Sequence, residues 1–115
     1  MPALGNVNSK ILIVGLAPSI RGSGRTGRMF TGDKSGDFLF KVLYKSGLAH
    51  KAKNYFQPTK CMITAVLRCP LPPRFPQSSI KLALENCKEY LLNDINLMSN
   101  LTTIVTLGNV AWYQI

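Results

Sequence analysis

The segment Gly22–Gly36, GSGRTGRMFTGDKSG, combines the residue types from which a pocket for a nucleobase could be built. Its one aromatic residue, Phe30, offers a flat apolar face on which a planar base can stack. The glycines would let backbone N–H groups approach the carbonyl oxygens of the base. The carboxylate of Asp33, three residues later, could orient a water molecule or stabilise positive charge at a sugar carbon. We interpret this segment as the site for a base withdrawn from a nucleic-acid strand.

Four cations in and beside this segment are predicted to face the phosphates of that strand: Arg21, Arg25, Arg28 and Lys34. Two structural alternatives stay open at this point. Phe30 could be an ordinary loop anchor packed on the core. Asp33 could be an Asx-type turn residue, a common role for aspartate in a Gly-Asp pair.

Two phosphate-binding patterns match the segment only in part. Gly22, Gly24 and Gly27 satisfy G-x-G-x-x-G, but they begin eight residues after Val14. The dinucleotide fingerprint requires these glycines directly after a strand. GRMFTGDKS resembles a P-loop, except that Asp33 stands where the phosphate-binding lysine should be. Because a carboxylate there would repel the phosphate, we exclude nucleotide hydrolysis.

The charge of the chain narrows the classes of partner. Its 115 residues suffice for one domain, and a hydrophobic content of 46% is typical of globular proteins. Lys and Arg number 14 against 5 Asp and Glu, a net charge of +9, and residues 38–84 contain no acid. This excess of positive charge favours nucleic acid as the binding partner, with an anionic membrane as the second choice. A basic protein without a polyanionic partner is the alternative.

The cellular compartment is inferred from the lack of a membrane span and of a signal peptide in the sequence. No apolar run approaches the roughly 18 residues that a membrane span needs, and the start, MPALGNVNSK, lacks the apolar core of a signal peptide. We therefore expect a soluble, cytoplasmic protein. In that reducing compartment Cys61, Cys69 and Cys87 are expected to be free buried thiols, with metal or cluster ligands as the alternative.

Apolar runs predict three strands, at Lys10–Val14, Cys61–Leu67 and Thr102–Gly108. The helix expected after the first strand has Ser35 as N-cap, Asp37 in its first turn and Gly47 as its stop. Its apolar residues recur at helical spacing, at Phe38, Leu39, Val42 and Leu43.

Two further helices complete the predicted order. One begins at Ser78 or Ser79, after a proline-rich loop, and ends near Met98; the other begins at Asn109 and is cut after one or two turns. Alternating strands and helices predict an α/β fold with three α/β/α layers around a mostly parallel central sheet. We expect residues 1–115 to form part of an incomplete domain, with an unpaired edge on a three-stranded sheet.

Several blocks of the sequence, taken in order, resemble one known family. They are GLAPS (Gly15–Ser19), GRTGRMFTGDKSGDFLF (Gly24–Phe40), ITAVLRCP (Ile63–Pro70), ENCKEYLLNDI (Glu85–Ile95) and IVTLGNVAW (Ile104–Trp112). Together they resemble the type 5 (UdgB-like) uracil-DNA glycosylases over nearly the whole chain. The resemblance implies a prokaryotic, monomeric DNA repair enzyme. Such an enzyme flips uracil out of DNA and hydrolyses its N-glycosidic bond to leave an abasic site.

The resemblance also implies roles for particular residues. Asp33 would be the catalytic residue, because Leu16 stands where other branches of the superfamily carry a polar, water-activating side chain. Phe30 matches the aromatic residue that stacks on uracil. The floor of the pocket would be formed by Gly15, Leu16, Ala17 and Pro18.

The resemblance further implies a [4Fe–4S] cluster, of which Cys69 and Cys87 match two of the four thiolate ligands. Cys61, inside a predicted strand, is interpreted as a core thiol. The family's first cysteine pair and its C-terminal histidine motif have no match, and the single histidine, His50, matches no motif position. The alternatives are therefore a non-catalytic DNA-binding remnant, or a remnant without a stable fold of its own.

Overall fold

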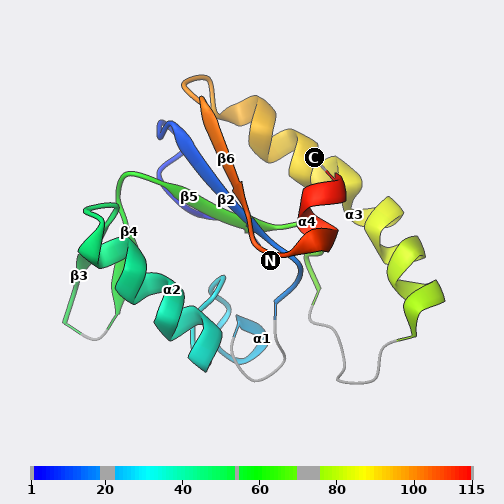
Figure 1. Ribbon diagram of the computed structural model, residues 1–115, viewed down its shortest axis with the longest axis horizontal. Coiled ribbons are helices and arrows are strands. Elements are labelled where there is room, and N and C mark those ends of the chain that lie inside the picture. Colours follow the sequence, from blue (N-terminus) through cyan, green and yellow to red (C-terminus); the bar gives the residue numbers. More distant parts are fainter. Residues whose placement is uncertain (1, 19–22, 54, 70–75, 115) are drawn as a thin grey trace.

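The computed structural model describes residues 2–18, 23–53, 55–69 and 76–114, and only the backbone of residues 24, 25 and 77. Within this part of the chain, a four-stranded sheet lies between two layers (Figure 1). The strand order is β1 (Leu4–Gly5), β5 (Met62–Ala65), β2 (Ile11–Gly15) and β6 (Thr103–Thr106). β2 pairs in parallel with β5 and with β6, whereas β1 runs antiparallel to β5. The predicted α/β fold with a mostly parallel sheet is confirmed.

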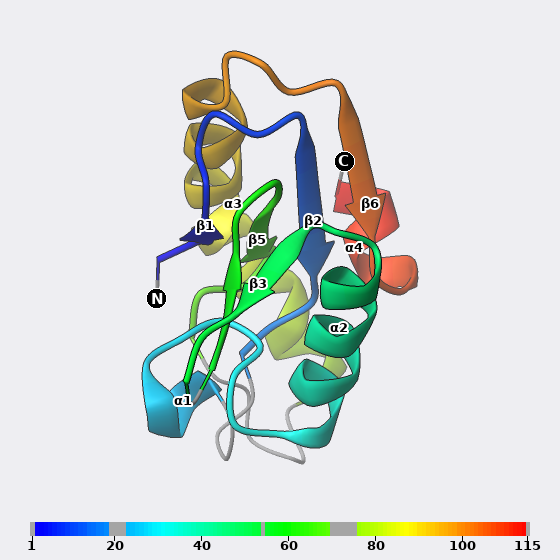
Figure 2. The same cartoon turned by 90° about the vertical axis from the view of Figure 1, so that its left-hand side faces the viewer.

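Helices and a hairpin make up the two outer layers. The layer that contains α2 (Lys34–Lys45) also holds the hairpin of β3 (Ala49–Lys51) and β4 (Phe56–Pro58). The other layer consists of α3 (Gln77–Leu97) and α4 (Asn109–Gln114). Figure 2 shows the hairpin and α2 in front of the sheet and α3 behind it. The short helix α1 (Ser23–Thr26) belongs to the loop between β2 and α2. None of the described helices is long and apolar enough to cross a membrane.

β2 is buried on both faces, as its continuous apolar run predicts. Leu12 and Val14 belong to the cluster that packs against α3, and Ile13 belongs to the cluster that packs against α2. These three side chains are at most 3% exposed. Burial of each stabilises the fold by about 1.5–3 kcal/mol. The central strand is therefore held in place by both layers.

The face of α2 that packs on the sheet presents Gly36, Phe40 and Leu43, spaced by four and three residues. The helix ends as predicted, because Gly47 adopts a φ of +79° directly after the capping residue Ser46. Its predicted start was wrong. The N-cap is Asp33 rather than Ser35, which lies inside the first turn.

The sheet is larger than the sequence predicts. β1 pairs with β5 and covers an edge that was expected to be unpaired. This strand has two residues, too few for an alternating pattern to be recognised. The hairpin of β3 and β4, with three residues in each strand, was missed for the same reason.

Candidate functional site

A cavity of about 420 Å³ opens at the carboxyl end of β2. Its walls come from the residues that follow β2, from the loop that contains Phe30, from the first turns of α2, and from Leu107 after β6. Ligands of open parallel sheets bind at this end of the strands. We call it the β2 cavity. Among the residues that line it are Gly15, Leu16, Ala17, Pro18, Phe30 and Asp33.

The floor of the β2 cavity is fixed by backbone hydrogen bonds. The amide of Val66 donates to the carbonyl oxygen of Gly15 at 3.0 Å, and the amide of Leu67 donates to that of Leu16 at 2.9 Å. A Cβ atom on Gly15 would come within 3.0 Å of the ring of Phe30. Glycine therefore lets the aromatic ring lie directly against the floor.

Phe30 has a backbone conformation that is unusual for a bulky residue. Its φ of 53° lies in the left-handed region, which costs of order 1–3 kcal/mol for a residue other than glycine. The hydroxyl oxygen of Ser23, which is 2% exposed, accepts a hydrogen bond from the Phe30 amide at 2.8 Å. The ring is thus held half-buried at the cavity wall by a contact across seven residues of loop.

The carboxylate of Asp33 caps α2 and also lines the β2 cavity. Its Oδ1 accepts a hydrogen bond from the Gly36 amide at 2.8 Å, which orients the side chain. A Cβ atom on Gly36 would come within 3.0 Å of the carbonyl oxygen of Phe30. This glycine lets the Phe30 loop pack closely against the helix. The half-buried carboxylate of Asp33 therefore acts as a local cap, as the structural interpretation expects. The same carboxylate is also placed where the interpretation as a catalytic residue requires it, at the wall of the cavity.

The four predicted DNA-binding cations differ in their surroundings. The guanidinium of Arg28 donates to the carbonyl oxygen of Phe56 at 3.1 Å and lies 4.9 Å from the ring centre of Tyr55. It therefore ties the loop to the hairpin. Lys34 is exposed at the start of α2. Arg25 belongs to α1, but its side chain is outside the described part of the chain, and Arg21 lies outside the described residues altogether.

Gly36, Phe38 and Ser23 also contribute to this site, although none of them was predicted from the sequence. Gly36 could have been found, since Asp33 and Gly36 have the spacing of an N-cap and its amide donor. Phe38 was assigned to the buried stripe of the helix, but it is 72% exposed and lines the β2 cavity. No sequence pattern indicated Ser23, because its hydrogen bond with the Phe30 amide depends on the path of the loop.

Comparison with known proteins identifies the family. The model of the uracil DNA glycosylase superfamily matches residues 2–115. The chain belongs to this superfamily. Type-5 uracil-DNA glycosylase of Mycobacterium tuberculosis is 37% identical over 97% of the chain and 43% of that protein. The proteins of that name from Pyrobaculum aerophilum and Thermus thermophilus are each 34% identical, over 97% and 96% of the chain.

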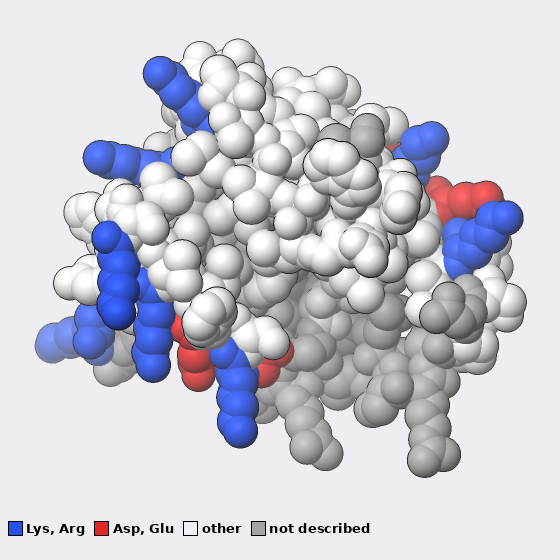
Figure 3. Space-filling view, in the orientation of Figure 1, with Lys and Arg blue, Asp and Glu red and all other residues white. Residues whose placement is uncertain are grey.

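The chain spans about half the length of the curated relatives that it matches, namely 43% to 51%. The predicted resemblance to type 5 uracil-DNA glycosylases is confirmed by these matches. Figure 3 shows how charge is distributed on one face of this superfamily member. Lys and Arg gather on the side where Figure 1 has α2 and the hairpin, and again on α3, and acids accompany them in both places.

The cysteines of this superfamily member occupy two environments. Cys61 is fully buried, and burial raises the pKa of its thiol to about 11. It is a core thiol, as predicted. Cys69 is exposed and Cys87 half-buried, and both line a separate cavity of about 550 Å³ that also includes Pro2 and Ala3.

A [4Fe–4S] cluster requires four ligands, usually thiolates. In the described ranges, no group of three or more His, Cys, Asp or Glu side chains could hold a metal ion. Cys69 and Cys87 share one cavity, as two ligands of a common group would, but they supply half of the set. The described residues therefore do not fit a complete cluster site.

Proposed function

We propose that the β2 cavity receives a uracil flipped out of DNA and that the protein hydrolyses the bond between this base and its deoxyribose. The curated relatives named type-5 uracil-DNA glycosylase support the choice of reaction. The observation that carries the proposal is the meeting of Phe30 and Asp33 at one cavity. The reaction needs both an apolar face for the base and a carboxylate beside the sugar.

In this proposal the ring of Phe30 stacks on the uracil, and the backbone of Gly15 and Leu16 forms the floor beneath it. The cavity volume of about 420 Å³ lies within the roughly 300–1,000 Å³ usual for small-ligand sites. Because the ring and the floor are already fixed, binding would not have to order them. Stacking of one base on an aromatic side chain contributes about 1–3 kcal/mol.

The chemical step breaks the bond between C1′ of the sugar and the ring nitrogen of uracil. The bonding electron pair leaves with the base, so that positive charge develops at C1′ and negative charge on the uracil. Water then adds its oxygen to C1′ and releases a proton, and the uracil takes up a proton. The role that we propose for Asp33 is to orient this water and to stabilise the positive sugar. Leu16 has a hydrocarbon side chain and can do neither.

Uracil-containing DNA is the partner in this proposal, and basic side chains would attract its phosphates. Lys34 lies exposed beside the β2 cavity at the start of α2. Arg21 and Arg25 are proposed as further phosphate contacts on the strength of their position in the sequence. Arg28 would act mainly by holding the loop against the hairpin, since its guanidinium is already engaged there.

No step in this proposal passes through an iron–sulfur cluster. Cys69 and Cys87 are proposed as cluster ligands only in a form of the protein in which other groups complete the set. The excision chemistry proposed for Asp33 and Phe30 takes place in the β2 cavity, which neither cysteine lines.

The test is uracil excision by the purified chain. A single-stranded oligonucleotide with one uracil is incubated with the protein and then treated with alkali, which cleaves abasic sites. We expect cleavage at the uracil and none in a matched strand with thymine. Absence of cleavage together with equal affinity for the two strands would contradict the proposal. Absence of cleavage with tighter binding of the uracil strand would identify a base-binding protein without activity.

A further inference from the structure

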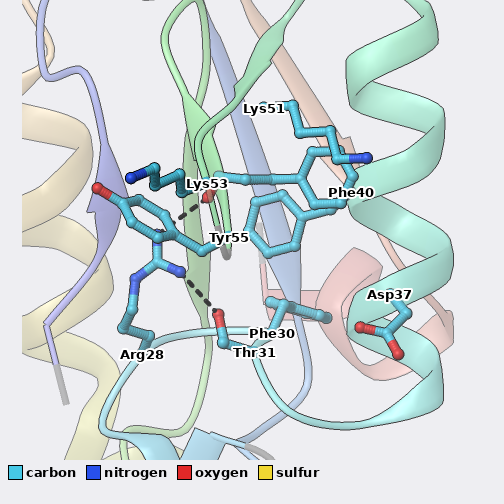
Figure 4. Close-up of a pocket in the computed structure, with 9 residues that line it drawn as sticks. Arg28, Phe30, Thr31, Asp37, Phe40, Lys51, Lys53 and Tyr55 are labelled. Carbon is cyan, nitrogen blue, oxygen red and sulfur yellow. Dashed lines mark hydrogen bonds between the residues drawn. The ribbon is translucent and has the colours of Figure 1, made fainter.

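A second cavity, of about 280 Å³, lies on the other side of Phe30. It is formed between the loop that contains Arg28, the helix α2, and the hairpin of β3 and β4 (Figure 4). We call it the hairpin cavity. Phe30 lines both this cavity and the β2 cavity, so the two sites share a wall.

Aromatic rings form the apolar part of the hairpin cavity. Phe40 and Phe56 stack with their ring centres 6.0 Å apart and their planes within 6° of parallel. Tyr55 is 51% exposed, and the guanidinium of Arg28 lies 4.9 Å from its ring centre. Arg28 also donates to the backbone of Phe56. The hairpin is thus fixed against the loop, with an exposed aromatic residue at the cavity.

Cations stand beside these rings. Lys51 and Lys53 are both exposed and line the cavity from the hairpin (Figure 4). No acid occurs in residues 38–84, which include the whole hairpin. Exposed aromatic faces combined with lysines are the usual means by which proteins hold a single strand of nucleic acid without reading its sequence. Neither lysine was among the residues predicted to contact DNA.

We propose that the hairpin cavity holds a base that neighbours the flipped uracil on the same DNA strand, while Lys51 and Lys53 contact the adjoining phosphates. The neighbouring position rests on the proposed function, because it requires uracil on the other side of Phe30. The shared wall supports this arrangement, since consecutive nucleotides would pass from one cavity to the next across a single aromatic residue.

The lining also indicates which part of the nucleotide enters. Asp37, on α2, lies across the cavity from Arg28 (Figure 4). A carboxylate repels phosphate, but it can accept a hydrogen bond from the amino group of a base. The base is therefore the part that enters, and the phosphates stay with the solvent-exposed lysines of the lining. The volume of about 280 Å³, just below the roughly 300 Å³ at which the usual range for small-ligand sites begins, suits one base.

The test measures binding of a uracil-containing single strand to two variants of the chain, Lys51→Ala/Lys53→Ala and Tyr55→Leu. The double variant is expected to lower the slope of log affinity against log salt by about 1.4 in magnitude, at roughly 0.7 for each phosphate that a lysine no longer neutralises. Tyr55→Leu is expected to weaken binding about fivefold or more, because stacking is removed, with an unchanged slope. Lys81→Ala/Lys88→Ala, which removes two exposed cations from α3, is the matched control.

Strand length makes the test specific to a neighbouring base. Two shortened strands are compared, one with the uracil at its 5′ end and one with the uracil at its 3′ end. For the strand that lacks the neighbouring base, both hairpin variants should bind as well as the unchanged chain does. Deficits that persist with both shortened strands, or hairpin variants that bind as the control does, would overturn the proposal. Failure of the proposed function looks different. The uracil and thymine strands would then bind alike, while the hairpin variants still weakened binding to both.

Discussion

Asp33 contributes to local structure through a capping bond of its Oδ1, and the same carboxylate lines the β2 cavity. Oδ1 accepts the Gly36 amide at the first turn of α2. Asparagine can make this capping bond as well as aspartate, whereas alanine cannot. Asparagine has no negative charge, however, and cannot stabilise a positive sugar. Substitution at this one position can therefore separate the capping role from the proposed chemical role.

We predict that Asp33→Asn lowers the rate of uracil excision by about 100-fold or more, because the charged group at the reacting carbon is lost. Its unfolding free energy should match that of the unchanged chain. Asp33→Ala should lose excision to the same extent and, in addition, about 1 kcal/mol of unfolding free energy. Rates come from single-turnover assays and stabilities from urea unfolding. Full activity in Asp33→Asn would show that the carboxylate has only a structural role.

Cys61 provides a prediction on pH dependence. Burial raises the pKa of this thiol from 9.0 to about 11, so the folded chain keeps a proton that the unfolded chain releases. Stability should therefore be unaffected below pH 9 and fall as the pH rises from 9 towards 11. Urea unfolding across this interval measures the fall. Cys61→Ala should reduce it, whereas Cys69→Ser, at an exposed position, should not; an equal fall in all three proteins would contradict the assignment to Cys61.

At the scale of elements, the site depends on how closely the Phe30 loop approaches α2. The carbonyl of Phe30 occupies the space in which a side chain at position 36 would lie. The Ser23 hydroxyl accepts a hydrogen bond from the amide of Phe30 and so fixes the loop at a second point. The ring of Phe30 reaches the floor at Gly15 because the loop is held at both of these points.

Gly36→Ala should move this loop. Alanine gains about 1 kcal/mol in helix propensity over glycine. Its Cβ would, however, meet backbone atoms of Phe30, which cannot rotate away as a side chain could. We predict a net loss of about 1–3 kcal/mol in unfolding free energy, together with weaker binding of uracil-containing strands. Ser35→Ala, at the exposed neighbouring position, should change stability by less than about 0.5 kcal/mol. Unchanged stability in Gly36→Ala would mean that the loop has room to move.

Elements with strong local patterns could be predicted from the sequence. β2 has five consecutive residues buried or nearly so, and α2 has both a helical period and a glycine stop. The cap at Asp33 was misassigned because Ser35 and Asp33 are both good capping residues, and only the backbone path selects between them. β1 and the strands of the hairpin were missed because two or three residues are too few to show an alternating pattern, and β1 in addition pairs with a segment far along the chain. The grouping of Phe30 and Asp33 in one site was predicted from the residue types of a single loop, whereas the place of Gly15 in that site came from the family resemblance.

At the scale of the whole molecule, the proposed phosphate contacts and the proposed base site lie in different regions. On the face shown in Figure 3, the described basic side chains gather on the side of α2 and the hairpin and again on α3. The β2 cavity is lined largely by apolar side chains and glycine. Counterion release makes phosphate contacts sensitive to salt, while stacking of an uncharged base is not. The two contributions should therefore be separable in solution.

We predict that the affinity for single-stranded DNA falls steeply and linearly, on logarithmic axes, as salt rises. The ratio of the affinities for uracil and thymine strands should stay constant over the same range, since both strands carry the same phosphates. Fluorescence anisotropy titrations at several salt concentrations provide both quantities. A ratio that changes in parallel with the affinity would show that discrimination depends on the phosphate contacts rather than on the cavity.

Nuclear magnetic resonance on the isotope-labelled chain can show whether uracil binds in the β2 cavity. A uracil-containing strand should shift the amide signals of residues 15–17 and 30–33 saturably, and a thymine strand of the same length should not. This measurement does not require catalysis, so it tests the cavity alone. Uracil-specific shifts confined to α3 and α4, or equal shifts with the two strands, would contradict the assignment of the β2 cavity.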